Sequence, residues 1–555
     1  MKKFFPYKLS LVLIVLIATC ISSCEKMLEE NPKSFLNPNA FFVDDVSLKT
    51  GITGAYAITQ SLYTNNMATI IAGVGTDIET STGGAGQRQD LDTYASTGLT
   101  SVFRTYWADN YILVQRACAM IERAPDVSGA SEGVKRRVVA EAKFLRALAY
   151  LNLVRAFGEV PLVVKETVSP DFDLPRAPIK DVYARILADL DDALEEGALL
   201  KVKDVAEPGR ANYWAVKALK GRALVSMAAY KESAKIPGYA QIDQTVQSLY
   251  EQARDVLKDV IDAGVYDLEP LYTDVFSIDK KNSNVESIWD VQFSVDPYGS
   301  SWSKDFYGLQ GTGKKPTNTF RFFASIGQSA IKPAPSFYYF FKDGDSRREI
   351  NVPTYTIDFT NNVPTSKKSF DIKVAMDPNE TKAAPIWTLM GTAKYQWGAW
   401  NAEMPFLFSQ CPNNINIIRF ADVLLMYAEA ALKANGGLAP ESAVDAANRV
   451  VKRARGLDAG GKVIPASATP NFPNYTTATL TFDEILQERA RELCFEHIRW
   501  YDLVRTGLLK VKVEARYTPK VKVTIDESMD YLYPVPSVEI DVTTNTAGFK
   551  QNPGY

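Results

Sequence analysis

Histidine and cysteine are both scarce in this chain, and their scarcity excludes several kinds of site. His497 is the single histidine among 555 residues, so zinc sites built on two or three histidines are excluded and histidine general-base catalysis would rest on one side chain. That residue lies in the segment RELCFEHIRWYDL, whose dense helical pattern favours a structural role for it. The five cysteines are odd in number and widely spread, so they do not predict a disulfide framework.

The chain also lacks a charge excess, long apolar runs and complete catalytic motifs. The 62 basic and 65 acidic side chains nearly balance, so there is no electrostatic footprint for nucleic acid. After the N-terminal signal, no run approaches the roughly 20 apolar residues of a membrane-spanning helix. Neither G-x-S-x-G nor H-E-x-x-H occurs. A hydrolase needs only two carboxylates brought together by the fold, so that class of enzyme stays open.

Two segments approach binding motifs without completing them. GLQGTGKK nearly matches a phosphate-binding loop, but Lys315 stands where the magnesium-binding Ser or Thr belongs, so we expect a flexible loop there. In DGDSRRE we expect a turn in which Asp345 pairs with Arg347 or Arg348, because the segment lacks the full set of oxygen ligands of a calcium loop. We therefore nominate no metal ligand and no cofactor.

The N-terminus resembles the export signal of a bacterial lipoprotein. Three lysines among the first eight residues precede the apolar run 9–18, which is too short to span a bilayer. A pair of small residues then precedes Cys24, as in a lipobox. We predict that residues 1–23 are removed and that Cys24 carries the lipid, with Cys20, which follows Thr19, as the weaker alternative. An ordinary secreted form is the competing interpretation.

Apolar residues recur at helical spacing over much of the chain. The stripe that begins at Val138 and ends at Gly158 is the clearest case. Two Ala-rich helices joined by Gly436 and Gly437 form a unit of about 34 residues, which is the length of a tetratricopeptide repeat. We predict further helices over 179–196, 212–230, 249–263, 419–434, 442–455 and 482–504.

Between residues 271 and 410 the helical pattern fades, and short alternating runs such as ESIWDVQFSV predict strands. This segment holds five of the eight tryptophans. A flat ring beside small polar residues suits a sugar, which has an apolar C–H face and an edge of hydroxyls, so Tyr298, Trp302 and Trp400 are candidate ligand contacts. Burial in the core or contact with a partner protein is the alternative for each ring. Tyr395 and Trp397 would share one face of a strand, which favours burial against the scaffold.

Several long stretches carry a family resemblance. They are EAKFLRALAYLNLVRAFGEVPLV, RAPIKDVYARILADLDDAL, GRANYWAVKALKGRALVSMAAY, IIRFADVLLMYAEA, ERARELCFEHIRWYDLVRTG and YPVPSVEI with the terminal QNPGY. Together they strongly resemble the SusD/RagB family of outer-membrane nutrient-binding lipoproteins, from Cys24 to Tyr555. The acidic residues after Cys24 look like the export signal of surface-exposed lipoproteins of Bacteroidetes. His497 stands where the family often has glycine, and Ala117 and Cys118 stand where many members carry asparagine; we expect both departures to affect helix packing only.

The resemblance implies a mainly α fold, with tetratricopeptide-like helical hairpins as the scaffold and a loop-rich, short-strand region that binds ligand. It implies a single domain over residues 24–555, in which 271–410 is the loop-rich aromatic insertion. It also implies binding without catalysis: a protein lipid-anchored at the cell surface in the outer membrane, which captures glycans or oligosaccharides and delivers them to a SusC-like TonB-dependent transporter. The alternatives are a surface-anchored hydrolase using paired carboxylates and a structural transporter partner without a ligand of its own.

Ligand contacts vary among members of the family, so the resemblance transfers regions and not a motif. Those regions are the N-terminal loops and the aromatic loops after the middle of the chain. Asp77 and Arg88 are nominated for hydrogen bonds, and the rings are nominated for stacking. The nominated ligand-binding residues are Asp77, Arg88, Tyr94, Tyr298, Trp302 and Trp400.

Overall fold

The computed structural model describes residues 41–64, 71–81, 86–167, 169, 171–294, 311–312, 331–360, 363–377, 390–395, 413–516 and 523–555. Of the residues named above, Thr19, Cys20, Cys24, Tyr298, Trp302, Lys315, Trp397 and Trp400 lie outside the described residues. Most of GLQGTGKK lies outside them as well.

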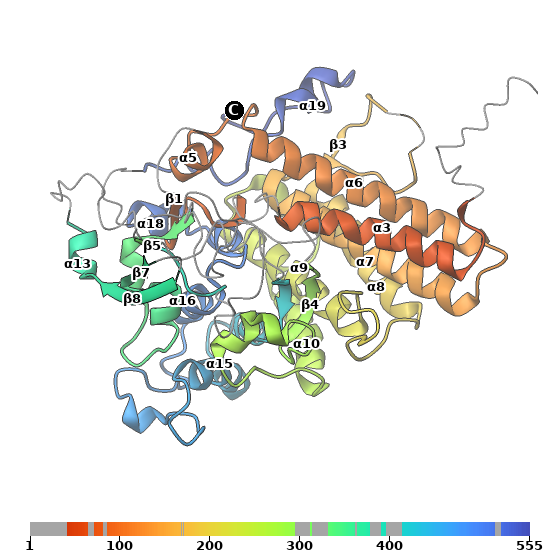
Figure 1. The fold of residues 1–555 in the computed structure, drawn as a ribbon. Coiled ribbons are helices and arrows are strands. Elements are labelled where there is room, and N and C mark those ends of the chain that lie inside the picture. Colours follow the sequence, from red (N-terminus) through yellow and green to blue (C-terminus); the bar gives the residue numbers. More distant parts are fainter. Residues whose placement is uncertain are drawn as a thin grey trace, which may run out of the picture.

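Long α-helices make up the body of the protein (Figure 1). Each helix packs against the next in chain order, from α3 through α6, α7, α8, α9 and α10 to α14 and α15, and α16 packs on α14. This is the order of stacked helical hairpins, so the expected mainly α, tetratricopeptide-like scaffold is confirmed. The bounds are α3 Asp45–Thr64, α6 Ser101–Arg123, α7 Glu132–Phe157, α8 Ile179–Glu195, α9 Tyr213–Ser233, α10 Val246–Asp262, α14 Phe420–Ala434, α15 Glu441–Ala454, α16 Phe482–Leu493 and α17 Arg499–Arg505.

Among the residues that the structure describes, none of the helices combines the length and the apolar character needed to cross a membrane.

The helix ends follow local signals in the sequence. Gly158, which we expected to end α7, has a φ of 73°, a left-handed conformation that glycine adopts without steric cost. The side chain of Asn212 caps α9, because its Oδ1 accepts from two backbone N–H groups of the first turn, both at 3.0 Å. Gly436 and Gly437, with φ values of 66° and 88°, form the predicted break between α14 and α15.

The helix predicted over 482–504 is wrong in its middle. The structure has two helices there, α16 and α17, separated by residues 494–498. Phe495 and His497 have φ values of 61° and 63°, and a right-handed helix excludes such values. His497 therefore lies in a turn between helices, at a position whose backbone suits glycine. The helices α3 and α6 were not among those predicted from periodicity.

Short strands join distant parts of the chain. The expected strand in ESIWDVQFSV is confirmed as β4, which pairs antiparallel with β9. Strands β1 and β6 also pair antiparallel, and β5, β7 and β8 form a three-stranded sheet. The bounds are β1 Glu79–Ser81, β2 Val160–Pro161, β3 Arg176–Ala177, β4 Ser287–Val291, β5 Gly311–Thr312, β6 Ile331–Pro333, β7 Tyr355–Thr360, β8 Val363–Ser369 and β9 Ile415–Arg419.

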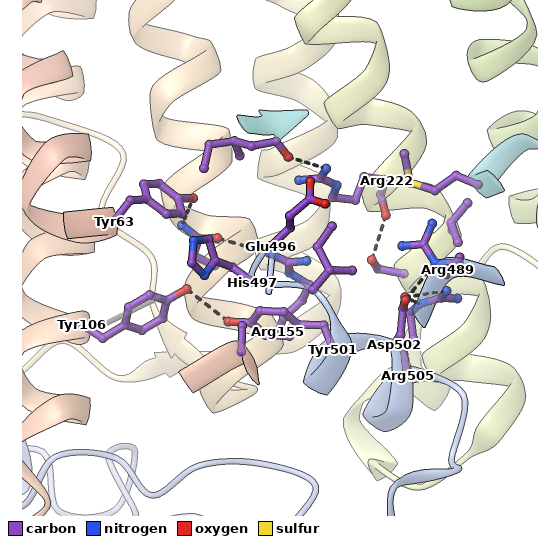
Figure 2. Close-up of a pocket in the computed structure, with 17 residues that line it drawn as sticks. Tyr63, Tyr106, Arg155, Arg222, Arg489, Glu496, His497, Tyr501, Asp502 and Arg505 are labelled. Atoms are coloured by element: carbon purple, nitrogen blue, oxygen red, sulfur yellow. Dashed lines mark hydrogen bonds and ion pairs between the residues drawn. The ribbon is translucent and has the colours of Figure 1, made fainter. Parts of the chain in front are cut away.

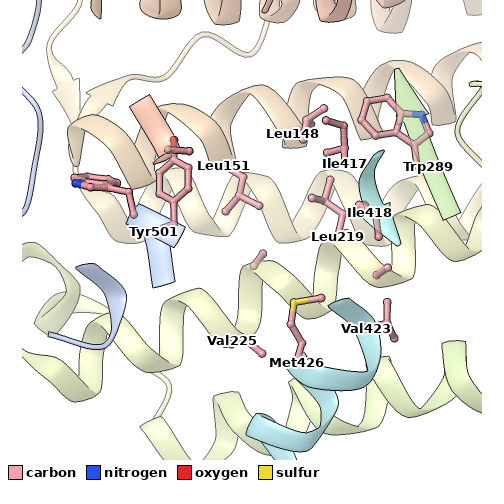
Figure 3. Packing of buried hydrophobic residues seen from close by; sticks show 14 of the residues in the cluster. Leu148, Leu151, Leu219, Val225, Trp289, Ile417, Ile418, Val423, Met426 and Tyr501 are labelled. Carbon is pink, nitrogen blue, oxygen red and sulfur yellow. The ribbon is translucent and has the colours of Figure 1, made fainter. Parts of the chain in front are cut away.

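The β4–β9 pair lies inside the helical body. Figure 3 shows Leu148 of α7 and Leu219 of α9 close to Ile417 and Ile418 of β9. All four side chains are buried, and the indole of Trp289 in β4 packs edge-on against a phenyl ring of α7 with centroids 5.1 Å apart. Apolar burial on both sides therefore holds the two strands firmly in place.

A network of buried charges, which the sequence patterns do not predict, crosses this core. The guanidinium of Arg419, at the end of β9, contacts the carboxylates of Glu286, Glu492 and Glu496 at 2.6, 2.6 and 2.7 Å. Arg453 of α15 binds Glu286 at 2.9 Å and Glu492 at 2.5 Å. These contacts tie β9, α15 and α16 together, and removal of one partner would leave a buried charge uncompensated.

The turn in DGDSRRE belongs to the same network. Asp345 pairs with Arg347 through two hydrogen bonds of 2.7 and 2.9 Å, as expected. Arg347 also contacts Glu488 of α16 at 2.8 Å. Burial alone would raise the pKa of Glu488, but the guanidinium groups of Arg347 and Arg491 lower it to about 2.

Candidate ligand-binding face

Paired strands fix the points from which the aromatic segments leave the scaffold. The chain leaves β4 at Val291 and enters β9 at Ile415, and these two residues are partners in the sheet. The segment with Tyr298 and Trp302 follows Val291, and the segment with Trp400 precedes Ile415. Both nominated aromatic segments are therefore attached to the same end of one buried strand pair.

A second strand pair anchors the N-terminal region of the candidate site. The chain leaves β1 at Ser81 and enters β6 at Ile331, and these residues are also partners. Helix α5 (Gln87–Asp92), which carries Arg88, begins shortly after Ser81. The chain between β4 and β6 is thus held at one end beside β9 and at the other end beside β1, which α5 contacts.

Asp77 has a structural role in the described fold. Its two carboxylate oxygens accept hydrogen bonds from Nε and Nη2 of Arg499 at 2.8 and 2.5 Å, and the residue is 2% exposed. Arg499 also donates to the carbonyl of Leu486 at 3.0 Å. The pair joins the turn before β1 to α16 and α17, and the nomination of Asp77 for ligand hydrogen bonds stays a prediction.

Arg88 and Tyr94 are both partly exposed, on α5 and just after it. Tyr94 has a φ of 57°, and its hydroxyl donates to the carbonyl of Gly75 at 2.8 Å. Burial raises the pKa of Tyr94 well above its usual value, so the hydroxyl keeps its proton as a donor. The hydrogen bond fixes the ring relative to the scaffold, and ligand contact by either residue stays a prediction.

Asp92 and Arg516 hold this region together and were not found from the sequence. The Asp92 carboxylate accepts from the hydroxyl of Thr80 at 2.8 Å, from the backbone N–H of Ser81 at 3.1 Å and from Arg516 at 2.8 Å. Arg516 donates in addition to the carbonyls of Thr76 and Glu79, both at 3.0 Å. These residues are more than 400 positions apart in the sequence, and only the fold brings them together. A pattern of local spacing therefore cannot predict their contact.

A groove of about 290 Å³ adjoins the β4 anchor. Its walls come from Tyr56 and Gln60 of α3, from residues 207–210 and from residues 289–292. The amide of Gln60 donates to the carbonyl of Gln292 at 2.7 Å, which joins two walls of the groove. Amide, carboxylate and guanidinium groups line the groove together with aromatic rings, a composition that suits a small ligand rich in hydroxyl groups.

Two aromatic residues of the loop-rich segment are buried. Trp289 is 2% exposed, and its indole N–H donates to the carbonyl of Gly209 at 2.9 Å. It therefore supports the wall of the groove and offers no open face for stacking. Tyr395 is also buried, as expected, and its hydroxyl donates to the carbonyl of Phe495 at 2.6 Å. Part of the aromatic enrichment of residues 271–410 therefore reflects rings that are buried in the core.

A small polar cavity of about 40 Å³ lies deeper, between α9, α14 and the turn that holds His497 (Figure 2). Figure 2 shows the His497 ring between Tyr63 and Tyr501, and the Tyr63 and His497 ring centroids are 6.2 Å apart. Burial, with a further contribution from the Lys394 charge, lowers the pKa of His497 to about 3. The ring is therefore neutral at physiological pH, and the expected structural role agrees with this setting.

A helical-hairpin scaffold with an irregular face attached to it defines a SusD-like fold, and solved structures of that class match this one. A SusD homolog from Bacteroides thetaiotaomicron has a TM-score of 0.74 at 21% identity, covering 93% of this chain and 98% of that chain. A laminarin-binding SusD-like protein has a TM-score of 0.68 at 23% identity, covering 93% and 100%. Surface glycan-binding protein A from Bacteroides thetaiotaomicron, in complex with laminarihexaose, has a TM-score of 0.66 at 18% identity, covering 92% and 100%.

Sequence comparison gives the same family. One family model, described as the SusD family, matches residues 285–555, and another, described as starch-binding and associating with the outer membrane, matches residues 27–229. SusD-like protein P2 of Formosa agariphila is 25% identical over 559 residues, which is 99% of this chain and 100% of that protein. A SusD-like protein of Bacteroides ovatus is 23% identical over 531 residues, covering 90% and 82%. The chain belongs to the SusD/RagB family, so the resemblance read from the sequence is confirmed.

Proposed function

We propose that this protein binds glycans or oligosaccharides at the cell surface, without turning them over, and delivers them to a SusC-like TonB-dependent transporter. The observation that carries the proposal is the shared anchorage of the aromatic segments. Two segments that supply Tyr298, Trp302 and Trp400 are attached to paired strand ends, Val291 and Ile415, on a buried and ion-paired core. A rigid scaffold with attached variable segments suits specific ligand recognition.

The same end of β4 carries the groove between α3 and residues 207–210. Its polar lining and its place beside the attachment point of the aromatic segments support a ligand made of hydroxylated rings. The family description of starch binding and the laminarin and laminarihexaose in the names of two structural neighbours point to the same class of ligand. Arg88 and Tyr94, beside the other anchor, are proposed to complete the ligand-binding face.

Membrane attachment is part of the proposal. Residues 1–23 are proposed to be the signal peptide, Cys24 the lipid-bearing residue, and residues 24–555 one domain. Several acyl chains, at roughly 0.8 kcal/mol per buried methylene, suffice for stable anchoring at an outer membrane. The family description of association with the outer membrane supports this location.

Binding is tested by affinity electrophoresis of the chain from Glu25 onward through gels that contain single polysaccharides. We expect one polymer to retard the protein, and we expect Trp302→Ala or Trp400→Ala to weaken the binding at least about tenfold, as for aromatic hot spots. Phe172→Ala is the matched control, because Phe172 is 50% exposed and lies outside the proposed face. Retardation that all three variants retain in full would refute the role of the nominated rings.

The same samples separate the alternatives. Release of reducing ends from the bound polymer would favour a hydrolase with paired carboxylates, for which two carboxyl groups about 5 to 10 Å apart are needed. If no polysaccharide retards the protein, and nutrient uptake survives both tryptophan variants, the results would favour a structural partner of the transporter without a ligand of its own. Co-purification of the lipidated protein with a transporter barrel tests the delivery step.

A further inference from the structure

The 40 Å³ cavity beside His497 is lined by more positive than negative charge. Four arginines face it, Arg155, Arg222, Arg489 and Arg505, together with the carboxylates of Glu496 and Asp502. A buried guanidinium group without a counter-charge is costly, so the partners of each of these arginines matter.

Three of these guanidinium groups have carboxylate partners. Arg222 and Arg489 share Asp422 at 2.7 Å each, Arg489 also binds Asp502 at 2.8 Å, and Arg505 binds Asp502 at 2.8 Å and Glu429 more closely. The remaining carboxylate, Glu496, is held elsewhere, by Arg419 at 2.7 Å and Lys394 at 2.6 Å. The positive and negative charges of these pairs therefore cancel one another, and none of the carboxylates is a partner of Arg155.

Arg155 has no carboxylate within ion-pair distance in the part of the chain that the structure describes. The residue is 9% exposed. Its Nε donates to the carbonyl of Leu151 at 3.0 Å and its Nη2 to the amide oxygen of Asn152 at 3.2 Å. The guanidinium also lies over the Tyr501 ring, 4.1 Å from the centroid. These are neutral partners, so one positive charge of the cavity lining stays uncompensated.

The hydrogen bonds at the cavity show the same imbalance. Tyr63 accepts from Asn152 at 3.4 Å, which leaves its own O–H proton without an acceptor among the described residues. The hydroxyls of Tyr106 and Tyr501 are 3.1 Å apart and one of them donates to the other, so one proton of that pair is also spare. The Nη1 group of Arg155 donates to no described atom. The lining therefore offers spare donors, whereas the oxygens of Glu496 and Asp502 already accept from arginines and a lysine.

We infer that this cavity binds a small monovalent anion of the halide class, such as chloride, which is held by Arg155, Tyr63 and the Tyr106–Tyr501 pair. A volume of about 40 Å³ accommodates one to about three water-sized species. A single negative charge compensates the one unpaired guanidinium, and an acceptor without protons matches the surplus of donors. Water alone would satisfy the hydrogen bonds but would leave the charge of Arg155 uncompensated.

The anion site is distinct from the proposed glycan face and does not rest on it. Arg155 lies near the end of α7, Tyr63 near the end of α3, and Tyr501 in α17, so the anion would tie the first helices of the scaffold to α17. We expect it to stabilise the fold, because a ligand that binds only the folded state raises the unfolding temperature by mass action.

Two measurements on the purified mature protein test the site. Crystals soaked in sodium bromide are expected to show an anomalous peak in the cavity beside Arg155. In solution, replacement of 150 mM sodium chloride by sodium gluconate is expected to lower the unfolding temperature by about 2 °C. Arg155→Met is expected to abolish this halide dependence, and Tyr63→Phe to raise the half-maximal chloride concentration about fivefold.

Tyr183→Phe is the matched control, because it also removes a buried tyrosine hydroxyl, one that is 3.3 Å from the hydroxyl of Tyr239 and outside this cavity. It is expected to keep the full halide dependence. If Arg155→Met fails to fold, Tyr63→Phe carries the comparison. A cavity without an anomalous peak overturns the inference, and so does a peak without any halide dependence, which would mean an adventitious ion only. Equal halide dependence in wild type, Tyr63→Phe and Tyr183→Phe overturns it as well.

Discussion

The single histidine makes one pH effect unusually easy to isolate. Burial lowers the pKa of His497 to about 3 in the folded protein, whereas an unfolded chain has the ordinary value of about 6.5. Below pH 6.5 the unfolded state therefore binds a proton that the folded state does not bind. Stability is fully present above this pH and falls as the pH drops from 6.5 toward 3.

The size of the effect follows from the two pKa values. Between pH 7.5 and pH 5.0 the free energy of unfolding should fall by about 2 kcal/mol through His497 alone, since each pH unit below 6.5 costs up to about 1.4 kcal/mol. Other groups titrate in this range as well; burial, for example, raises the pKa of Asp530 to about 6. The informative quantity is therefore the difference between wild type and a variant without the imidazole.

The assay is urea unfolding of wild type, His497→Asn and His497→Gly at pH 7.5, 6.5, 5.5 and 5.0. Asn and Gly both tolerate the φ of 63° at this position, and any loss of packing acts equally at every pH. Wild type should lose about 2 kcal/mol more than either variant over the range. The ring signal of the one histidine, observed by NMR, should stay that of a neutral imidazole down to pH 5. Parallel stability profiles, or a titration near pH 6.5, would refute the buried-histidine argument.

Three further substitutions test other parts of the scaffold by urea unfolding. Asp77→Asn breaks the buried pair with Arg499, so we expect a loss of about 3 to 5 kcal/mol; a loss below about 1 kcal/mol would show that Asp77 is free for another role. Asn212→Ala removes the cap of α9 and a hydrogen bond of 3.1 Å to the carbonyl of Ile288, so we expect a loss of about 1 to 2 kcal/mol, and unchanged stability would contradict the cap. Burial lowers the pKa of Lys332 to about 7, so below pH 7 the folded protein carries this buried charge at a cost in free energy. The unfolded lysine stays charged, without that cost, up to about pH 10.4. Lys332→Met should therefore stabilise the fold by about 2 to 3 kcal/mol more at pH 6 than at pH 9; an equal gain at both pH values would exclude the charge as its cause.

Helix positions were largely predictable because burial of one face imposes a 3.6-residue period. Helix α8 was expected over 179–196 and lies at Ile179–Glu195, and the break at Gly436 and Gly437 was located from composition. The same reasoning failed at residues 494–498. The apolar and charged residues there keep a helical spacing, and only the left-handed backbone of Phe495 and His497 interrupts the helix.

The candidate face was less predictable, because its support comes from contacts between distant segments. The pairs Arg499–Asp77 and Arg516–Asp92 join the C-terminal part of the chain to the N-terminal part, and one sequence contains no local trace of such pairing. The charges of α16 gave a partial signal: Glu488 and Glu492 lie four residues apart among arginines. That spacing is equally typical of an exposed helix, and the structure shows that both carboxylates are buried.

The pairing of Val291 with Ile415 brings the two ends of the insertion between them to one place on the scaffold. Both ends of the intervening chain are fixed side by side, and β6 and the β5–β7–β8 sheet lie between them in the sequence. Arg347 and Tyr395 of this insertion contact Glu488 and Phe495 of the helical body, so an exchange of residues 292–414 should preserve that body only where the replacement keeps these contacts. The insertion is therefore attached at its two ends by the Val291–Ile415 pair and in its middle by the pairing of β6 with β1 and by the ion pairs of Arg347, and only the stretches between these attachments can vary in length without disturbing the core.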